Sequence, residues 1–467
     1  MNDAIAGVAH PLPVPPRTGA APADAPVIDV GAVVETQRIG WFAAGLVGWT
    51  FAAMFFTGFN FAGIAFVVPP LAREWHVPPG SFGSAFGIGI FGMMLGSLFF
   101  GYVGDRIGRK QTLVLGGWIF GIVTLASIWA PNITVLAIER CIAGFGFYAV
   151  IPNGIVLVNE FAPKRLKATW ATGAFIGFSV GTAAAGFVAA AAIPAFGWQS
   201  MFVISGVGPI VVALITMFTL PESIQFLALR PKRWGELAQI VTRLQPGTVV
   251  APGTSFVIRH EHHQDAQFTP AMLFAGGLKF TTPVIWLFYI CNSMAVFFMT
   301  SWLPVLIQGV GISPAHAAIT TGLYALGGIA GGLIAGSLID RFGMLTIAIM
   351  PTLGTLVSAT LGFGLSEVGL MIAACAAGFF VVGTQNAIMT VAPMIYPTSY
   401  RAKGEGAAIA VGKVGAISGP VIGGMLLMAH LPVHELFYAA AAAILCGAIL
   451  AYMFAALFRR HFRGEAA

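Results

Sequence analysis

Charged side chains are scarce in this sequence. Only 9% of its 467 residues are Asp, Glu, Lys or Arg, whereas a soluble protein carries about 25%. So few charges cannot cover a surface that faces water, which excludes a soluble enzyme, a nucleic-acid-binding domain and a disordered scaffold. The chain does contain 58% hydrophobic residues and 59 glycines, and glycine is frequent in membrane helices. The composition therefore predicts a membrane protein.

Cysteines are few, and the motifs of cofactor chemistry are lacking. No nucleotide-binding motif occurs, which argues against an ATP-driven pump. The cluster His260–His263 stands in a polar segment and is interpreted as a solvated loop rather than a metal site. We expect no metal and no cofactor. The cysteines lack metal-ligand spacing and are expected to pack as small buried thiols: Cys141, Cys291, Cys375 and Cys446.

Twelve apolar stretches are long enough to cross a membrane, since a membrane helix needs roughly 20 mostly apolar residues. The fold class is therefore an all-α membrane protein with two pseudo-symmetric six-helix bundles. The expected domains are a disordered cytoplasmic tail at 1–40, bundles at 41–220 and 281–458, a cytoplasmic central loop at 221–280, and a tail at 459–467. The spans are predicted at 41–69, 82–104, 111–130, 134–160, 169–192, 200–220, 281–309, 314–338, 344–365, 367–392, 404–427 and 432–457.

The basic residues predict the orientation, because cytoplasmic segments carry an excess of Lys and Arg. Only Arg73 falls in a predicted outer loop, and Arg140 and Lys413 fall inside spans; all the other basic residues lie in predicted inner segments. This distribution places both termini in the cytoplasm. No cleavable signal peptide is evident, so the first span is expected to direct insertion. The net charge of +6 thus reflects topology, and we expect no nucleic-acid partner.

The two halves of the chain repeat each other. A loop motif at 101–110, after the second span, recurs at 336–343, after the eighth span. Two six-span repeats around a central cavity are an architecture of secondary transporters. A second repeated pair is Asn153 and Asn386. The residues matched in the loop motif are Gly101, Asp105, Arg106 and Gly108 against Gly336, Asp340, Arg341 and Gly343.

The loop motif, read as G-x-x-x-D-R-x-G-R-K, and the phrase Arg140-x-x-x-Gly144-x-Gly146 resemble the major facilitator superfamily. Further phrases resemble its bacterial aromatic acid:proton symporters, and the resemblance runs from about Val27 to Arg459. These phrases are Leu220-Pro-Glu-Ser223, Ser301-Trp-Leu-Pro304, Gly383-Thr-Gln-Asn386, Tyr396-Pro397 with Arg401-Ala-Lys-Gly404, and Gly412-Lys413 with Gly419-Pro420.

The resemblance implies that the loop motif is a latch between the two halves. Asp105 would face the positive N-terminal end of the eleventh span, and this contact would break as the halves move. The alternative is that the basic residues only follow the inside-positive rule. The residues expected to take part in gating are Gly101, Asp105, Arg106, Gly108, Arg109, Asp340, Arg341 and Arg401.

Carboxylates are missing where the resemblance leads us to expect them. The family carries an acidic pair, D-G-F-D, in the first span, but this chain reads Thr57-Gly-Phe-Asn60. Both residues can hydrogen-bond a substrate, and neither can carry a proton near neutral pH. No Asp or Glu lies in the middle of a span. Glu160, which matches an acidic position of the family, is the remaining candidate for coupling; an ion pair with Lys164 or Arg165 is the alternative.

Two cations lie inside spans. A charged residue near the middle of a membrane costs roughly 2.5–3.5 kcal/mol on insertion scales and usually faces a cavity. Arg140 and Lys413 are therefore predicted to make a cavity that suits an anion, although a structural role with Glu139 is open for Arg140. Further cavity candidates are aromatic or amide side chains: Tyr148, Asn153, Tyr289, Asn292, Trp302, Tyr324, Gln385 and Asn386.

We predict a monomeric carrier in a bacterial inner membrane that moves an organic, aromatic acid anion by alternating access. The expected partners are that small acid, the proton and the lipid bilayer. The resemblance implies proton symport, whereas Thr57 and Asn60 favour a uniporter or an anion exchanger, and export is also open. A membrane-bound acid sensor is the alternative from another class. An enzyme is disfavoured because no nucleophile or acid–base pair lies within a span.

Overall fold

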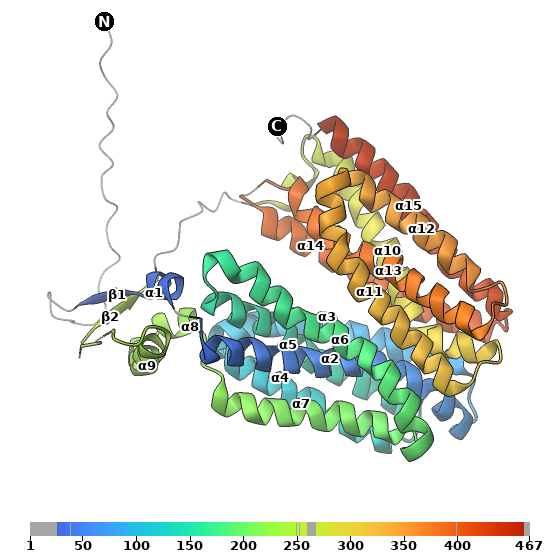
Figure 1. Ribbon diagram of the computed structural model, residues 1–467, viewed down its shortest axis with the longest axis horizontal. Helices are drawn as coiled ribbons and strands as arrows, with labels where there is room; N and C mark the ends of the chain where they lie inside the picture. Colours follow the sequence, from blue (N-terminus) through green and yellow to red (C-terminus); the bar gives the residue numbers. More distant parts are fainter. Residues whose placement is uncertain are drawn as a thin grey trace, which may run out of the picture.

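A computed structural model of the chain describes residues 26–37, 39–248, 250–251, 253–258, 268–397 and 399–461. The predictions for positions 1–25, for His260–His263 and for positions 462–467 concern parts outside the described residues. The described part is almost entirely helical (Figure 1).

The N-terminal bundle consists of six long helices, each built on one of the apolar runs in the sequence. They are α2 (Trp41–Glu74), α3 (Gly83–Ile107), α4 (Arg109–Ala126), α5 (Ile133–Phe161), α6 (Lys167–Phe196) and α7 (Gln199–Thr219).

The C-terminal bundle repeats this arrangement. Eleven continuous helical stretches of the described residues are long and apolar enough to cross a membrane, and one of them, Pro314–Thr360, has 47 residues. That stretch contains two helices, because the chain turns at Gly343, where φ is +67°. Twelve spans in two groups of six are therefore confirmed. The second six are α10 (Leu278–Gly309), α11 (Pro314–Phe342), α12 (Thr346–Thr360), α13 (Glu367–Ile395), α14 (Arg401–Met428) and α15 (Val433–His461).

Short 3₁₀ turns connect several of these helices. They are η1 (Pro79–Phe82), η2 (Ser127–Trp129), η3 (Lys164–Leu166), η4 (Pro231–Arg233), η5 (Pro270–Phe274) and η6 (Gly343–Leu345).

Glycines set the helix spacing inside each bundle. A Cβ on Gly58 would collide with the backbone carbonyl of Phe178, and a Cβ on Gly181 with that of Phe55, so α2 and α6 touch backbone to backbone. Gly327 and Gly378 join α11 to α13 in the same way. Lipid tails are as apolar as a leucine side chain, so helices in a membrane associate through such close packing.

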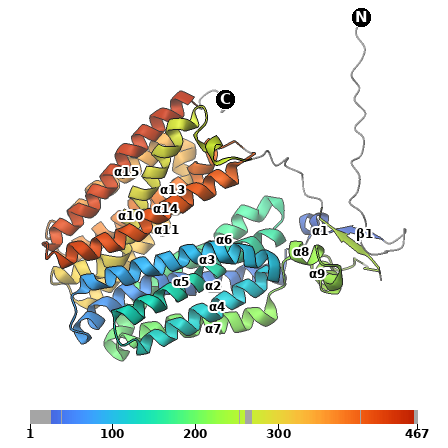
Figure 2. The ribbon, with the colours of Figure 1, turned by 180° about the vertical axis from the view of Figure 1, so that it is seen from behind.

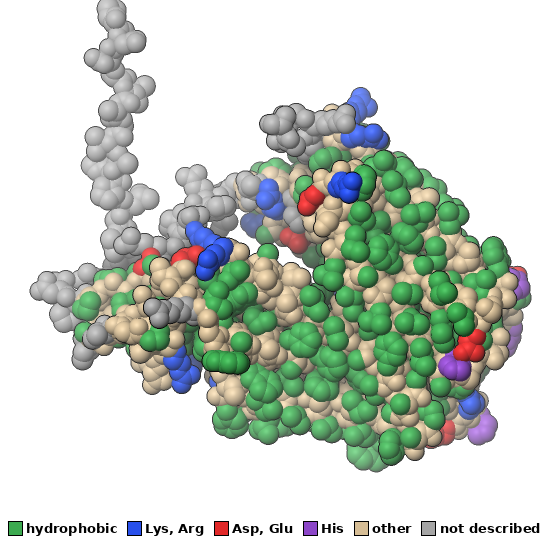
Figure 3. All heavy atoms as spheres, viewed as in Figure 1, with side chains coloured by type: hydrophobic (Ala, Val, Ile, Leu, Met, Phe, Trp, Pro, Cys, Tyr) green, Lys and Arg blue, Asp and Glu red, His purple; other side chains and the backbone are tan. Residues whose placement is uncertain are grey.

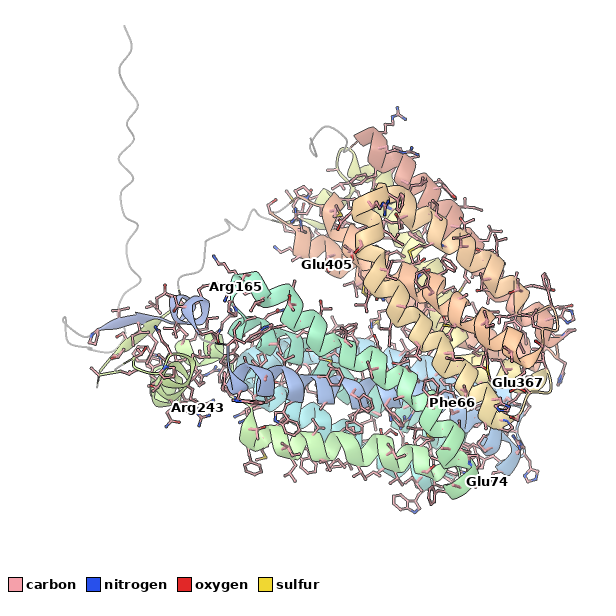
Figure 4. All side chains as sticks on the ribbon, in the orientation of Figure 1. Phe66, Glu74, Arg165, Arg243, Glu367 and Glu405 are labelled. Atoms are coloured by element: carbon pink, nitrogen blue, oxygen red, sulfur yellow. The ribbon has the colours of Figure 1, made fainter. Side chains whose placement is uncertain are left out.

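The two bundles meet at one end and diverge toward the other (Figures 1 and 2). At the closed end, a Cβ on Gly186 of α6 would lie 2.6 Å from the carbonyl oxygen of Ala318 on α11. Gly83 of α3 makes a similar approach to Gly424 of α14. A hollow separates the bundles at the other end (Figure 3). Glu74 and Glu367 lie at the closed end, whereas Arg165 and Glu405 stand on either side of the opening (Figure 4).

The prediction of a disordered tail over 1–40 is wrong for positions 27–36. These residues form β1 (Val27–Asp29) and α1 (Val30–Thr36), and β1 pairs in parallel with β2 (Ser255–Val257). The central segment predicted as a loop also contains α8 (Ile224–Ala228) and α9 (Trp234–Leu244).

This small unit is held by an apolar core of its own. Val30, Val33 and Val34 lie on one face of α1 and are buried together with Leu237 of α9 and Phe256 of β2. The same core includes residues of α5 and α6 from the N-terminal bundle. The unit therefore covers the open-end face of that bundle, and its two strands come from distant parts of the chain, one before the first span and one after the sixth.

Enlarging Gly186 is expected to force the closed end apart. The Gly186→Val side chain would press on the backbone of α11, and such overpacking costs roughly 1–3 kcal/mol. We expect the population of molecules in which the bundles have separated at this end to rise by about 5- to 150-fold. Spin labels at positions 74 and 367 would report this as a longer distance. Gly48→Val, on an exposed part of α2 with no atom within 4 Å of the added Cβ, should leave the distance unchanged; equal effects of the two substitutions would contradict the packing argument.

Candidate functional site

Arg140 is a buried cation that forms no ion pair with the residues the structure describes. Its side chain lies in α5 and donates from Nη2 to the Ser127 hydroxyl at 2.9 Å and from Nη1 to Oδ1 of Asn60 at 3.4 Å. The ring of Phe202 lies 5.3 Å from the guanidinium. Glu139 makes no ion pair with Arg140 in the described part of the chain. Neutral dipoles thus satisfy Nη1 and Nη2 of Arg140 and leave its charge in place, whereas its buried Nε has no hydrogen-bond partner among the described residues.

Asn60 positions the guanidinium. Its amide nitrogen donates to the Thr124 hydroxyl at 3.2 Å, which leaves Oδ1 to accept from Arg140. Thr57, predicted together with Asn60 to bind the substrate, donates its hydroxyl to the carbonyl of Ala53 within its own helix. Of the two residues that replace the family's acids, only Asn60 contacts the cation.

Lys413 joins the two bundles. Its ammonium group on α14 donates to the phenol oxygen of Tyr148 on α5 at 2.8 Å and lies 4.3 Å from the centre of that ring. Tyr148 comes eight residues after Arg140 on the same helix, or about 12 Å along its axis. Arg140 and the Lys413–Tyr148 contact thus lie at two levels along α5.

Four phenylalanines from four helices form an aromatic cluster in this region. Phe61 of α2 lies 5.5 Å from Phe297 of α10, 5.9 Å from Phe178 of α6 and 6.3 Å from Phe147 of α5, measured between ring centres. Phe61 and Phe147 also line a cavity of ≈ 50 Å³ beside Asn60 and Arg140. That volume holds one or two water molecules, so an aromatic ring can enter only when these side chains move apart.

The amide side chains predicted to line one cavity lie in different parts of the molecule. Asn292 of α10 donates to Oε1 of Gln385 on α13 at 2.7 Å, deep in the C-terminal bundle. Asn386 packs against Gly332 of α11. Asn153 accepts from Nη1 of Arg109 at 3.1 Å. Asn153 therefore belongs to the loop motif and not to the surroundings of Arg140.

The loop motif is bound to its own bundle. Asp105 forms an ion pair with Arg109 and is 69% exposed, and the guanidinium of Arg106 lies 4.4 Å from the ring of Tyr102. Gly108 has φ +111°, which favours glycine, and a Cβ there would collide with the carboxylate of Glu222. In this conformation α14 does not cover Asp105, so the predicted contact between them is absent from the described residues.

The repeated motif of the C-terminal bundle carries fewer contacts. Asp340 is exposed, and the guanidinium of Arg341 lies 5.4 Å from the ring of Phe342. Arg401 donates from Nε to the carbonyl of Tyr396 at 3.5 Å. Gly101 has no atom within 4 Å of an added Cβ, so in this conformation nothing packs against it.

Glu160 is held by the start of α8. Its Oε2 accepts from the Ser223 hydroxyl at 2.6 Å and from the backbone amide of Gln225 at 3.4 Å. Ser223 also caps α8 by accepting from the amide of Phe226 at 3.0 Å. These contacts identify Glu160 as an anchor for the central segment.

Several residues of the site were not predicted. Ser127 and Thr124, which hold Arg140 and Asn60, are single polar residues in apolar runs and carry no sequence signal for this role. Ser223 does carry one, because a serine before an apolar helical run is a common N-cap. Glu222 accepts from the backbone amide of Lys110 at 2.9 Å and follows an apolar span, where an acid is unusual.

Comparison with known proteins identifies similar chains. The sequence profile of the Major Facilitator Superfamily matches residues 50–311 and 285–465. The 4-hydroxybenzoate transporter PcaK of Pseudomonas aeruginosa is 33% identical, with 86% of this chain and 90% of the relative covered. The gallate transporter of Pseudomonas putida is 34% identical, with 91% and 96% covered. The benzoate transport protein of Acinetobacter baylyi is 29% identical, with 91% and 92% covered.

Solved structures show the same fold. A bacterial homologue of the human lysosomal transporter Spinster, in an inward-facing and occupied conformation, superposes with a TM-score of 0.69 at 15% identity, over 91% of this chain and 99% of that one. The nucleoside transporter NupG superposes with a TM-score of 0.67 at 13% identity, over 89% and 100%.

A double-mutant cycle tests the anchoring role of Glu160. Glu160→Ala and Ser223→Ala should each destabilise the purified protein, because a hydrogen bond to a charged group contributes about 1.5–3 kcal/mol. Both single variants remove the bond between Glu160 and Ser223, so the loss in the double variant should be smaller than the sum of the two single losses. Glu160→Gln, whose amide oxygen still accepts, serves as the matched control in thermal melting. Additive losses would contradict a shared bond.

Proposed function

The chain belongs to the major facilitator superfamily, and from that premise we propose that this transporter carries the anion of an aromatic acid across a bacterial inner membrane by alternating access. The observation that carries the proposal is the buried Arg140, which makes no ion pair among the described residues, beside an aromatic cluster. The carboxylate of a substrate would provide Arg140 with the ion-pair partner that it lacks among the described residues. Arg binds a carboxylate through two parallel hydrogen bonds. The phenylalanine rings offer apolar faces to an aromatic ring.

The names of the relatives support an aromatic acid. The similar chains transport 4-hydroxybenzoate, gallate and benzoate according to their names. We place the substrate carboxylate at Arg140 and its ring among Phe61, Phe147 and Phe178. A hydroxyl at the far end of the ring would then point toward Lys413 and Tyr148, where a phenol already binds the ammonium group. The hydroxyl of such a substrate would thus replace the phenol of Tyr148 as the hydrogen-bond acceptor of Lys413.

Helix register supports the latch role of Asp105. The helices α3 and α14 run antiparallel, and Gly83 faces Gly424 while Gly87, one turn later, faces Val421. When the same register is continued to the open end, Asp105 comes opposite the first turn of α14. Closure of this end would therefore place a carboxylate at a helix N-terminus, where negative charge is favoured.

The second half offers a matching contact. The helices α6 and α11 are also antiparallel, with Gly186 between Ala318 and Gly322. Continuing that register brings Asp340 opposite the start of α6 at Lys167. Both repeats of the motif would then act at the same end of the molecule, which the basic residues of the loop motif and central segment mark as cytoplasmic. We place both termini on that side.

Asn60 favours a second candidate function, a proton-independent uniporter or exchanger. A carboxylate at position 60 would neutralise Arg140 until a proton bound, and would thereby link anion binding to protonation. The Asn60 amide holds the guanidinium without changing its charge. Glu160 does not replace such an acid, because the start of α8 engages its carboxylate.

Substitutions at Arg140 test the substrate site. Arg140→Met should weaken binding of benzoate or 4-hydroxybenzoate about 10- to 150-fold, the range of a lost charged hydrogen bond. Arg140→Lys keeps the charge but cannot make the two parallel hydrogen bonds. Its affinity for the acid should lie between those of Arg140→Met and the parent protein. Binding is measured by calorimetry on purified protein, with Arg165→Gln at the exposed rim as the control. Unchanged binding in Arg140→Met would overturn the assignment.

Flux into proteoliposomes tests transport and coupling together. Radiolabelled 4-hydroxybenzoate should equilibrate, which separates a carrier from a sensor that only binds. In the uniporter case the parent protein responds little to an imposed pH gradient, whereas Asn60→Asp, which restores an acid beside Arg140, gains gradient dependence. Accumulation by the parent protein that collapses with the gradient would refute proton independence. Binding of the acid without flux would refute the proposal that the protein is a carrier.

A further inference from the structure

We propose that a cavity between α4, α7 and α9 binds the phosphate headgroup of an anionic phospholipid. The cavity has a volume of ≈ 340 Å³ and lies where the N-terminal bundle meets the central segment. Small-ligand clefts begin at about this size. The site is separate from Arg140 and from the loop motif's carboxylate, and it does not depend on the nature of the transported substrate.

Two cations in the cavity make no hydrogen bond or ion pair with their charged groups among the described residues. Lys110, at the start of α4, is half-buried, and Arg243, in the last turn of α9, is exposed. Neither the ammonium group of Lys110 nor the guanidinium of Arg243 takes part in a hydrogen bond, ion pair or ring contact among the residues that the structure describes. Glu222 and Glu236 act on Lys110 from a distance, but two cations without a direct ion pair at one cavity still favour an anion.

The acids that line the cavity are only partly engaged, because the buried Oε2 of Glu222 has no hydrogen-bond partner among the described residues and Glu222 and Glu236 both act on the charge of Lys110. Both oxygens of Glu236 accept from Arg233, at 2.8 and 2.6 Å, and this contact holds the pKa of the Glu236 carboxyl below its ordinary value. Oε1 of Glu222 accepts from the backbone amides of Lys110 and Ser223, each at 2.9 Å. The charges of Glu236 and Arg233 cancel, so the cavity retains a net positive charge from Lys110 and Arg243 against Glu222.

An apolar stripe leads into the cavity from the side of the membrane. Along α7, large side chains at helical spacing are exposed and continue to the cavity wall. The last two, Met217 and Phe218, are 50% and 77% exposed and line the cavity itself. The full stripe is Val203, Val207, Val211, Leu214, Met217 and Phe218. A ligand that reaches this cavity along the stripe must be apolar behind an anionic head.

The helix α9 sets the depth of the cavity. Its apolar side chains Leu237, Ile240, Val241 and Leu244 are buried in the core shared with the bundle. Arg243 flanks this face, lines the cavity and lies beyond the end of the membrane helices (Figure 4). Basic groups at this level meet the headgroups of the leaflet, and anionic lipids of the cytoplasmic leaflet attract them. The combination of free cations and an exposed apolar stripe selects a phospholipid over a free phosphate.

Lipid binding to the full-length protein tests the proposal. The delipidated transporter in detergent is titrated with phosphatidylglycerol, phosphatidylethanolamine or inorganic phosphate, and bound species are counted by native mass spectrometry. A cation near an anionic surface contributes roughly a factor of five in affinity. Lys110→Gln/Arg243→Gln should therefore weaken the first phosphatidylglycerol site by about 30-fold. Lys232→Gln/Arg165→Gln removes the same charge from exposed positions outside the cavity and should bind as the parent does.

Three results would overturn the proposal. Equal weakening by both double variants would show attraction to net charge instead of a site. Equal binding of phosphatidylethanolamine and phosphatidylglycerol would show that the free cations do not select the headgroup. Displacement of the lipid by inorganic phosphate at similar concentration would assign the cavity to free anions. Matching melting temperatures of the two double variants confirm that both are folded.

Discussion

The charge of Arg140 constrains the rest of the molecule. A guanidinium placed within a membrane span must be surrounded by acceptors, and here Asn60 and Ser127 provide them without adding negative charge. Coulomb attraction strengthens as the local dielectric constant falls, so the residual field of Arg140 acts strongly on any anion that enters. In the proposed site, a cation held by neutral dipoles and faced by aromatic rings would discriminate by charge first and by shape second.

The helix α5 connects this charge to the moving parts. It carries Arg140 at the level of the cavity, Tyr148 at the contact with Lys413, Asn153 at the loop motif and Glu160 at the central segment. Gly144, between the first two, lets α5 lie directly against α3. If the substrate binds where we propose, a shift of α5 that admits its ring would also displace the inter-bundle contact and the loop motif. Binding would then bias the closure of the halves through packed elements.

Sequence alone predicted the twelve spans, their division into six and six, and the family. These features depend on local quantities, namely the length of apolar runs and short motifs. The pairing of β1 with β2 was missed because neither strand is stable without a partner that lies far away in the sequence. Thr57 and Asn60 were correctly placed on one helix, but their different roles depend on Thr124 and Arg140, which other helices bring near. Glu160 was singled out for its charge, yet its function follows from Ser223, whose position depends on how the central segment folds back.

The absence of an acid beside Arg140 has an energetic consequence for the direction of transport. An anion that crosses alone moves against a membrane potential that is negative inside, and each charge costs about 2.3 kcal/mol per 100 mV. That energy corresponds to an internal concentration roughly 50-fold below the external one at equilibrium. A proton carried with each anion cancels the charge and removes this penalty. A carrier that keeps Asn60 neutral must therefore work on a steep inward gradient, exchange one anion for another, or export. Exchange balances charge without any titrating side chain, and of these modes it is the one that a fixed cation and an amide can support while still accumulating an acid.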